Sequence, residues 1–424
     1  MSSSQSAYHA PLSGPSGGPP PAGSHGAAGA GWGALRLASV LLISRAALCA
    51  TPPPDASLAS RHAHHSAGLT SQPAKVNTRP PKALSSSHTK RPPPEPLYRD
   101  NPTAMQAATE MAQRLQANPA WVRKTIGKAH RLGSVIQAVT PGALTAAKNY
   151  ALYRSRVVEP RRIQAGVRFW QRNAAILARA ERETGVSAST IVGILGVETI
   201  YGQRMGGYRT LDALSTLAFD FPTEHPKAAQ RAAYFLHELE EFLRLCKTQD
   251  LDPLAVRGSY AGALGMAQFM PSSWRQYAVD FDDDGRIDLF DSRADAIGSV
   301  ANYLAAFHWK PGMATHFAVQ LDPQKLDLAA LLQNDIVPSL SPAALLDKGV
   351  ALDASGARHP GLLALIELPN GSAPTQYVAG TDNFYTVTRY NWSSFYAMAV
   401  IELGQAVQAQ WQRERDAAPA QAKP

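Results

Sequence analysis

The chain is poor in cysteine, in charge and in long apolar runs. Its two cysteines, Cys49 and Cys246, cannot form a disulfide framework for 424 residues. Charged residues make up 17% of the chain. The apolar stretch between Leu35 and Ala50 is interrupted by Ser44 and Arg45, so it is too short for a membrane-spanning helix. Hydrophobic residues nevertheless account for 45% of the sequence, which is enough for a substantial core and one to three domains.

The first hundred residues differ in kind from the rest. They contain 15 of the 32 prolines and are otherwise dominated by Ser, Ala, Gly and His. Such a segment cannot bury enough apolar surface to fold, so residues 51–102 are predicted to form a disordered, proline-rich linker. Most of the net charge of +8 also lies in the first hundred residues, and residues 101–424 carry only +2. That balance argues against a nucleic-acid partner, whereas the basic tail suits an anionic envelope surface.

Residues 1–50 are predicted to be a targeting segment. The sequence from Leu35 to Ala50 suits export. Its ending, Ala46-Ala47-Leu48-Cys49, is similar to a bacterial lipoprotein cleavage box, in which Cys49 carries the lipid and attaches the protein to the membrane. Leu48 stands where such boxes prefer a small residue. Cleavage after Ala50 by an ordinary signal peptidase is therefore an open alternative.

From about residue 103 the apolar spacing predicts helices. Residues 103–116 and 168–185 place apolar residues three and four apart, and Gly185 is a reasonable helix end. Further helices are predicted over residues 230–248, 294–307 and 393–410, with a polar tail over 411–424. Residues 310–380 are less periodic and contain short extended pieces between Pro and Gly turns. The expected fold class is therefore mainly α (α+β), with a small β-rich subdomain.

Glu198 stands out among the carboxylates. It ends the apolar run IVGILGVETIYG at residues 191–202, which Ser187 precedes by one turn. A carboxyl group in so apolar a segment is poorly solvated, and poor solvation raises its pKa toward the range that a general acid needs. The alternative is that Glu198 marks a helix end and points to water. Asp212 is the nearest downstream acid, and its helical surroundings favour a structural role.

Residues 280–291, DFDDDGRIDLFD, match the spacing of an EF-hand calcium loop. Gly285 occupies the sixth position, where the loop turns sharply, and six aspartates in twelve residues repel each other unless a hard cation gathers them. The candidate ligands are Asp280, Asp282, Asp284, Arg286 through its carbonyl, Asp288 and Asp291. The alternative is an acidic surface turn that binds nothing. A single loop lacks a sensor's paired partner, so the predicted Ca²⁺ is structural.

Four separated stretches carry a resemblance to a known family. They are VETIYG (197–202), GSYAGALGMAQFMPSSW (258–274), the acidic loop and NFYTVTRYN (383–391). In this order they resemble the membrane-bound lytic murein transglycosylase B family of bacterial cell-wall enzymes, over residues 103–410. The resemblance implies a lysozyme-like catalytic core with an added helical region. It also implies that Glu198 is the single catalytic carboxylate. In this family, Asp is the usual residue at the last position of the calcium loop, which Asp291 occupies here.

The resemblance further implies a set of glycan-binding residues. Arg231 is similar to an arginine that lines the groove, although residues 223–228 look like an insertion before it. Small residues in 258–269 let a ligand approach the backbone, and aromatic faces suit sugar rings. Phe269 and Tyr303 could equally be core residues, and Tyr390 and Asn391 could instead cap the last helix at a strand-to-helix junction. The other implied contacts are Tyr153, Ser259, Gln268 and Tyr396.

The expected reaction cleaves the bond between N-acetylmuramic acid and N-acetylglucosamine in peptidoglycan. Glu198 protonates the glycosidic oxygen and then takes a proton from the muramyl 6-hydroxyl, which closes a 1,6-anhydro ring. Ser259, Tyr390 and Asn391 are expected to orient the acetamido group. We expect no organic cofactor and a monomer. The alternatives are a hydrolytic muramidase, a non-catalytic calcium-dependent peptidoglycan-binding module and a periplasmic scaffold.

Overall fold

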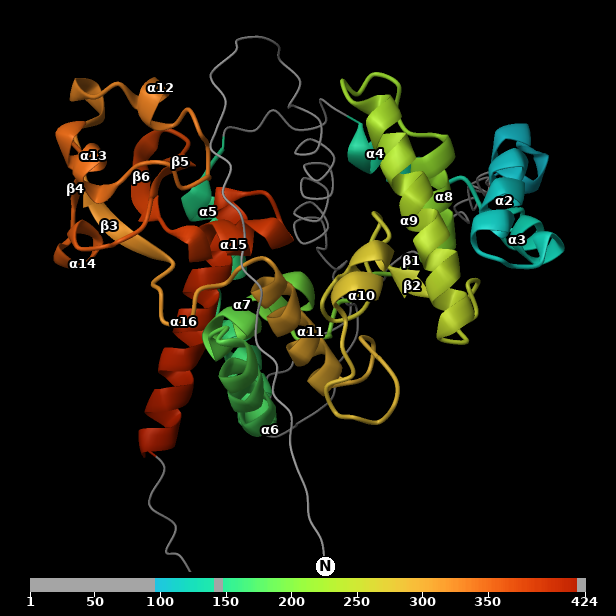
Figure 1. Cartoon of the computed structure of the whole chain (residues 1–424), viewed down its shortest axis with the longest axis horizontal. Coiled ribbons are helices and arrows are strands. Elements are labelled where there is room, and N and C mark those ends of the chain that lie inside the picture. The colour runs from blue at the N-terminus through green and yellow to red at the C-terminus, as the bar shows by residue number, and fades with distance from the viewer. Residues whose placement is uncertain (1–95, 141–147, 418–424) are drawn as a thin grey trace, which may run out of the picture.

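The computed structural model describes residues 96–140 and 148–417 (Figure 1). These residues form a mainly helical protein with two small antiparallel sheets. In the described ranges, no helix is long and apolar enough to cross a membrane. The expected mainly α class is confirmed. The predicted targeting segment, including Cys49, lies outside the described residues.

The folded chain begins before the predicted end of the linker at residue 102. Tyr98 opens the 3-10 helix η2 (Tyr98–Asp100) and is 2% exposed. Asn101 then caps α2 (Pro102–Arg114) by accepting a hydrogen bond from the backbone N–H of Ala104. Helices α3 (Pro119–Ile126) and α4 (Gly133–Val139) follow, and α4 leads toward the pair α8 (Thr210–Phe219) and α9 (Ala228–Thr248) (Figure 1).

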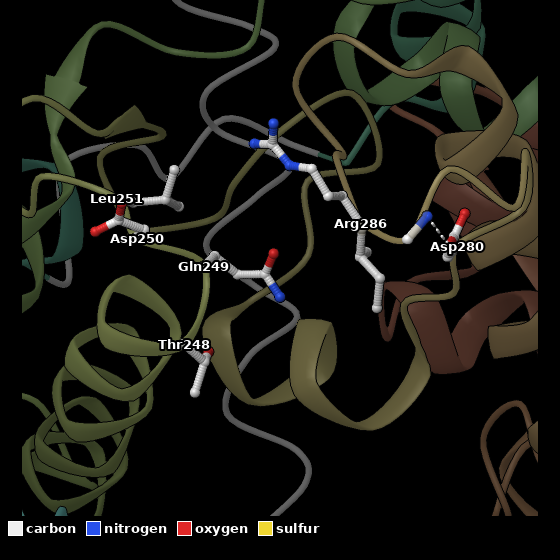
Figure 2. A pocket seen from close by; sticks show the side chains of 8 residues that line it. Thr248, Gln249, Asp250, Leu251, Asp280 and Arg286 are labelled. Atoms are coloured by element: carbon white, nitrogen blue, oxygen red, sulfur yellow. Dashed lines mark hydrogen bonds between the residues drawn. The ribbon is translucent and has the colours of Figure 1, made fainter.

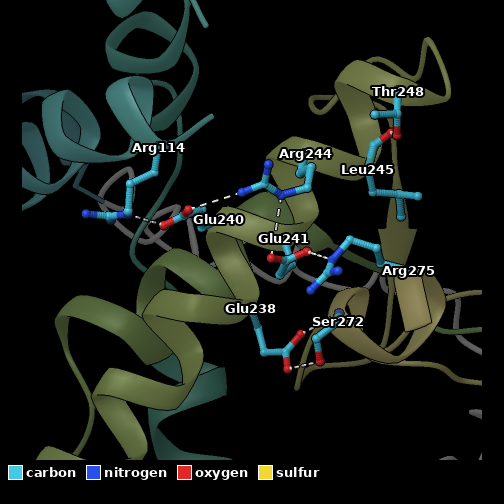
Figure 3. Close-up of polar contacts among 9 residues, drawn as sticks. All are labelled: Arg114, Glu238, Glu240, Glu241, Arg244, Leu245, Thr248, Ser272 and Arg275. Atoms are coloured by element: carbon cyan, nitrogen blue, oxygen red, sulfur yellow. Dashed lines mark hydrogen bonds and ion pairs between the residues drawn. The ribbon is translucent and has the colours of Figure 1, made fainter. Parts of the chain in front are cut away.

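Charged residues of α9 join it to its neighbours (Figure 3). Glu240 pairs with Arg114 of α2 at 2.8 Å, and Glu241 pairs with Arg275 of α10 (Pro271–Tyr277) at 2.5 Å. The fully buried Glu238 accepts hydrogen bonds from the backbone N–H and hydroxyl of Ser272, at 2.9 and 2.6 Å. These carboxylates therefore hold α9 in place and cap the first turn of α10.

Four helices form the centre of the molecule: α6 (Pro160–Thr184), α7 (Ala188–Thr199), α11 (Arg293–Ala306) and α16 (Ser394–Ala417) (Figure 1). Helix α6 ends at Gly185, whose φ of 71° provides the left-handed cap predicted there. Ser187 caps α7 by accepting a hydrogen bond from the N–H of Thr190. The short helix α5 (Tyr150–Val157) packs beside α16.

The predicted β-rich subdomain is present. Its sheet has the order β4-β3-β6-β5 and consists of β3 (His316–Gln320), β4 (Ala351–Leu352), β5 (Ala364–Asn370) and β6 (Ala373–Gly380). Along β5, Ala364, Ile366 and Leu368 belong to the main core, whereas Leu365 faces a smaller core. Strand β5 is therefore buried on both faces. The subdomain also contains short helices: η3 (Pro323–Lys325), α12 (Leu328–Leu331), α13 (Pro342–Asp347) and α14 (Ala354–Ala357). Of these, α12 and α13 contribute Leu331 and Leu345 to the smaller core.

Two boundaries near the C-terminus differ from the expectation. Residues 383–391 do not pass from a strand into a helix, because they lie in α15 (Asp382–Tyr390) and its C-cap. Helix α16 continues to Ala417, seven residues beyond its predicted end at residue 410. The reason is a packing contact, since Trp411 stacks on Trp170 of α6 with ring centroids 5.1 Å apart.

Candidate active site

Glu198 lies at the end of the buried helix α7, followed by a tight turn. Ile200, Tyr201 and Gly202 all have positive φ, at 51°, 58° and 88°, so the chain reverses at once. Thr199 fixes this turn: its hydroxyl accepts from the N–H of Gly202 and donates to the carbonyl of Met266, both at 2.9 Å. Glu198 itself is half-buried. Its carboxylate is therefore held by rigid backbone while part of the side chain remains accessible.

The surroundings of Glu198 favour its protonated form. Burial raises its pKa to about 7, and the hydrogen bond from Tyr396 acts in the opposite direction. The Tyr396 hydroxyl donates to Glu198 Oε1 at 2.6 Å. Within residues 96–140 and 148–417, no ion pair involves Glu198 and no second carboxylate shifts its pKa. Asp212 is structural as expected, since it accepts from the N–H of His130 and pairs with Arg209.

Three tyrosines predicted as glycan contacts surround this carboxylate. The charge of Glu198 contributes to raised pKa values for Tyr153, Tyr390 and Tyr396, after burial as the main cause. Tyr153 comes from α5, Tyr390 from the end of α15 and Tyr396 from the first turn of α16. Tyr390 is fixed by donating to the carbonyl of Ala267 at 2.5 Å. Segments far apart in the sequence therefore meet at one acidic side chain.

Phe269 and Tyr303 lie behind this group as core residues. They are 2% and 8% exposed, and their ring centroids are 5.6 Å apart. Tyr303 packs edge-on against Tyr390 at 4.9 Å and donates its hydroxyl to the carbonyl of Arg389 at 2.7 Å. Of the two alternatives left open by the sequence, the structure favours the core role. Their aromatic surface supports Tyr390 from behind.

Ser259 and Gln268 are also occupied by the protein. The Ser259 hydroxyl oxygen accepts from the N–H groups of Ala261 and Ala263, at 3.3 and 3.0 Å. The Gln268 amide donates to the carbonyls of Met205 and Gly265, at 3.1 and 2.9 Å. Both side chains therefore shape the loop over residues 258–269. The N–H of Met266 in this loop donates to the carbonyl of Leu289 at 2.7 Å, which connects the loop to the acidic loop.

Arg231 lies on α9, and Asn391 directly follows Tyr390 in the chain. Arg231 is 6% exposed on α9, and its charge interacts with Tyr234 and Tyr260. Asn391 is fully buried at the C-cap of α15 and does not cap the last helix. That cap is Ser393, whose hydroxyl oxygen accepts from the N–H of Tyr396 at 3.3 Å.

Comparison with known proteins places this site in a family. Residues 100–405 match the transglycosylase SLT domain. The chain belongs to this family. It is 40% identical over 318 residues to the membrane-bound lytic murein transglycosylase B of Escherichia coli (strain K12), a match that covers 73% of this chain and 84% of the relative. The resemblance inferred from the sequence is thus confirmed.

Two solved structures of transglycosylases share the fold. The E. coli lytic transglycosylase SLT35 in complex with calcium has a TM-score of 0.66 and 38% identity, covering 74% of this chain and 95% of that chain. SltB3 from Pseudomonas aeruginosa, in complex with NAG-anhNAM-pentapeptide, has a TM-score of 0.60 and 26% identity, covering 72% and 79%. The expected lysozyme-like core is confirmed by these transglycosylase neighbours.

The acidic loop gathers three of the predicted ligands. Carboxylate oxygens of Asp280, Asp282 and Asp284 all lie within 4.8 Å of one another. Gly285 turns the loop with a φ of 87°, as the EF-hand spacing requires. A set of three carboxylates suits a hard cation. Asp288 and Asp291 are not in this group, because Asp288 Oδ1 instead accepts from the N–H groups of Phe290 and Asp291.

A cavity of about 640 Å³ lies between the end of α9 and the acidic loop (Figure 2), and Glu198 does not line it. Gln249 and Asp250 stand on one side of it, and Asp280 and Arg286 on the other. None of the residues predicted to bind glycan lines it. This cavity therefore belongs to the acidic loop and not to the surroundings of Glu198.

Three residues near the two sites were missed by sequence reasoning. Asp295, 1% exposed, accepts from the N–H groups of Phe281 and Asp288, both at 2.7 Å, and so closes the acidic loop. Tyr201, 8% exposed, follows Glu198 in the tight turn and stacks on Phe169 with ring centroids 5.1 Å apart. Arg162 is buried in the first turn of α6. An acid one turn after Ser292 was a usable signal for Asp295, but nothing in the sequence marks Arg162 as buried.

Proposed function

We propose that this transglycosylase cleaves the bond between N-acetylmuramic acid and N-acetylglucosamine in peptidoglycan and leaves a 1,6-anhydromuramyl end. The observation that carries the proposal is the single carboxyl group of Glu198, with a pKa of about 7, at the end of a buried helix. Membership of the transglycosylase SLT family supports the same reaction.

The reaction uses Glu198 twice. In the first step the protonated carboxyl gives its proton to the glycosidic oxygen as that bond breaks, and an oxocarbenium-like sugar forms. In the second step the carboxylate takes the proton of the muramyl 6-hydroxyl, whose oxygen bonds to the anomeric carbon. No water is consumed, and Glu198 ends protonated as it began. A pKa of about 7 suits both steps, because the group must hold and release a proton near neutral pH.

A lone carboxylate favours an internal nucleophile over water. Hydrolases that retain or invert configuration use a second carboxyl group, about 5–9.5 Å from the first. Among the described residues, no such partner affects Glu198. A hydroxyl on the same sugar needs no second base to position it, since its effective concentration can reach ~10⁵ M or more.

The test is the mass of the products from purified sacculi. Muropeptides that are lighter by one water than hydrolytic products, with no reducing muramyl end, are expected. SltB3 was solved with NAG-anhNAM-pentapeptide, an anhydro compound of this class. Reducing ends would instead identify a muramidase, and binding of sacculi without any release of fragments would identify a wall-binding module.

Tyr153, Tyr390 and Tyr396 are proposed to contact the glycan at the cleavage point, because they surround Glu198. Ser259, Gln268 and Asn391 are proposed to hold loops in place. Backbone groups of these loops would then contact the acetamido group of the substrate. Arg231 is proposed to act farther along the groove.

The substitution Tyr396→Phe is expected to move the pH profile. It removes the hydrogen bond that lowers the pKa of Glu198, so this pKa rises. The acid form then persists to higher pH, and the alkaline limb of kcat/KM shifts upward by about half to one pH unit. Tyr150→Phe is the matched control, because its hydroxyl donates to Glu402. An unchanged alkaline limb in Tyr396→Phe would contradict the assignment.

The acidic loop is proposed to bind Ca²⁺ through Asp280, Asp282 and Asp284, with the Arg286 carbonyl, Asp288 and Asp291 completing the set. The relative SLT35 was solved in complex with calcium. The cation would offset the repulsion among these carboxylates and hold the loop closed. Through Leu289, Met266 and Thr199, the closed loop supports the turn after Glu198.

Added Ca²⁺ is expected to raise the melting temperature. When the free Ca²⁺ concentration is a hundred times the dissociation constant of the site, binding adds about 2.7 kcal/mol to the free energy of unfolding. Asp282→Asn should abolish most of this shift. Asp283→Asn is the matched control, because Asp283 lies in the same loop but outside the gathered group, 3.7 Å from Arg179. Equal melting curves in Ca²⁺ and in chelator would exclude the metal.

The protein is proposed to act in the bacterial periplasm, with Cys49 as a lipid anchor. The relative from E. coli is described as membrane-bound, and peptidoglycan lies in the envelope. The mass of the mature N-terminus tests both export and lipidation. A mass that begins at Cys49 with added acyl groups supports the anchor, and one that begins at Thr51 supports simple cleavage.

A further inference from the structure

Positive charge is unevenly distributed along the folded chain. Residues 148–180, which include α5 and most of α6, contain eight basic residues against one acidic residue, a net charge of +7. Residues 101–424 as a whole carry only +2, so the remainder of that range carries a net charge of −5. The basic residues are therefore concentrated on two consecutive helices of an otherwise slightly acidic protein.

Three of these basic residues lie on one exposed face of α6. Arg161, Arg168 and Arg172 are exposed, and their spacings of seven and four residues correspond to two turns and one turn of helix. We call this set the arginine stripe. It is about 16 Å long at a rise of about 1.5 Å per residue. It ends before the kink at Asn173, where φ is −121°, so it lies on the straight part of the helix.

The arginine stripe has no partner within residues 96–140 and 148–417. None of its three side chains forms an ion pair or a hydrogen bond there, whereas Arg179 on the same helix pairs with Glu183 at 2.8 Å. Glu414 of α16 accepts a hydrogen bond from Gln171 at 3.2 Å, but it pairs with no arginine of the stripe. The guanidinium groups of the stripe are therefore available to an external anion.

The buried side of α6 supports the catalytic turn. Phe169 stacks on Tyr201 with ring centroids 5.1 Å apart, and a Cβ at Gly166 would come within 2.4 Å of the Tyr201 hydroxyl. Tyr201 belongs to the tight turn that follows Glu198. Helix α6 packs on α7, α11 and α16 and lies at the lower edge of the molecule in Figure 1. One side of this helix thus holds the turn, and the exposed side carries the stripe.

We propose that the arginine stripe is a docking surface for carboxylates of the peptidoglycan network. The inference rests on the proposed function for its substrate. The peptides of peptidoglycan end in free carboxylates, and an arginine can bind a carboxylate through two parallel hydrogen bonds. Docking at the exposed side of α6 would hold the enzyme on the network while Glu198 cleaves a strand. It would add affinity for the intact polymer without any contact at the cleavage point.

The composition of this face favours network carboxylates over a lipid bilayer. Between residues 161 and 175, the other exposed side chains of α6 are Gln164, Gln171 and Ala175. Helices that bind at a membrane surface insert large apolar side chains, and basic clusters that bind anionic lipids have about four to eight Lys or Arg. The stripe has three arginines and no large apolar neighbour on its face, so a polar polyanion is the better match.

The experiment measures co-sedimentation with purified sacculi in the inactive Glu198→Gln background, so that turnover does not interfere. Three probes are compared: intact sacculi, sacculi whose carboxylates have been converted to neutral amides, and vesicles that contain an anionic phospholipid. Each probe is tested at about 50 mM and about 500 mM NaCl, because salt screens interactions between exposed charges.

Two triple variants are compared with this parent. The stripe variant combines Arg161→Gln, Arg168→Gln and Arg172→Gln, which keeps residues of good helix propensity on an exposed face. The matched control combines three substitutions of arginines that are also exposed and form no ion pair in the described ranges: Arg182→Gln, Arg293→Gln and Arg358→Gln. Both variants lose three positive charges, so they differ only in where the charge is removed.

The stripe variant is expected to bind intact sacculi about tenfold more weakly than the parent at low salt, since each exposed ion pair contributes about two- to threefold in affinity. The difference should disappear at high salt and on amidated sacculi. The control variant should stay within about twofold of the parent, and vesicles should not distinguish the three proteins. All three should melt at the same temperature, because the substituted side chains are exposed.

Equal weakening by both triple variants would assign the effect to net charge and overturn the inference, as would no weakening by either. A loss that persists on amidated sacculi would show that the stripe does not bind carboxylates. A loss on vesicles alone would make this face a membrane surface instead. The readout is separate from the proposed cleavage: if the wild-type protein released no anhydro products, binding that depends on the stripe would still establish the docking surface.

Discussion

Replacement of Glu198 by Gln is expected to lower kcat on peptidoglycan by about a thousandfold or more. General acid–base catalysis is worth 10²–10⁴ in rate, and in the proposed mechanism this carboxyl group serves in both steps. Glutamine fits the same space and can still accept the hydrogen bond from Tyr396, but it has no proton to exchange. Release of soluble muropeptides from labelled sacculi measures the effect. Activity within tenfold of wild type would mean that another group is the acid.

The same variant has a second expected signature, in stability. The folded-state pKa of Glu198 is about 7, above its value in the unfolded chain. The protonated group therefore contributes stability that is fully present below about pH 4.5 and is lost as the pH rises through 7. Glutamine stays neutral, so Glu198→Gln should be more stable than wild type at pH 8, by about 1–2 kcal/mol after allowing for partial exposure. Denaturant titrations at pH 4 and pH 8 separate this effect from misfolding, because the difference should vanish at pH 4.

The sequence predicted those features that depend on local chemistry. Gly185 was identifiable as a helix end because glycine adopts the left-handed conformation that closes a helix. Ser187 was identifiable only by its position one turn ahead of the apolar run, and the structure makes it the cap of α7. Gly285 was identifiable because the loop must turn with positive φ at that point. The perturbed acid, Glu198, followed from the apolar residues before it. In each case the decisive neighbours lie within a few residues along the chain.

The predictions failed or were incomplete where distant segments decide the outcome. Tyr390 and Asn391 were expected at a strand-to-helix junction, but they lie at the end of α15 and at its C-cap, and the apolar residues Phe384 and Val387 of α15 pack into the main core. Phe269 could be assigned to the core only once Tyr303 and Tyr390 were placed around it. Arg162 is one of two adjacent arginines with the same local pattern, and only the fold buries one and exposes the other.

The meeting of Glu198 with Tyr396 is the most demanding of these distant contacts, since 198 residues separate them. It depends on how closely α7 approaches α16. Gly193 lies against the backbone carbonyl of Val400, where a Cβ would come within 2.2 Å. Gly404 lies against the carbonyl of Ser189, where a Cβ would come within 2.0 Å. Backbone cannot move aside as a flexible side chain can, so these two glycines set the distance between the helices.

Gly404→Ala is therefore expected to destabilise the protein by about 3 kcal/mol, because overpacking of this kind costs 1–3 kcal/mol or more. At a helix position with free space around the glycine, the same substitution would stabilise the protein by about 0.5–1 kcal/mol. A loss of stability is therefore evidence of the clash. Gly207→Ala is the matched control: nothing lies within 4 Å of its Cβ position, and its unfolding free energy should change by less than about 0.5 kcal/mol.

Since the clash pushes α16 away from α7, the hydrogen bond from Tyr396 to Glu198 should lengthen, and kcat should fall even at temperatures where the variant is fully folded. Thermal melts together with kcat at 15 °C test both parts. A Gly404→Ala protein as stable and as active as the Gly207→Ala control would mean that the two helices have room between them, and that some other contact places the tyrosine beside the acid.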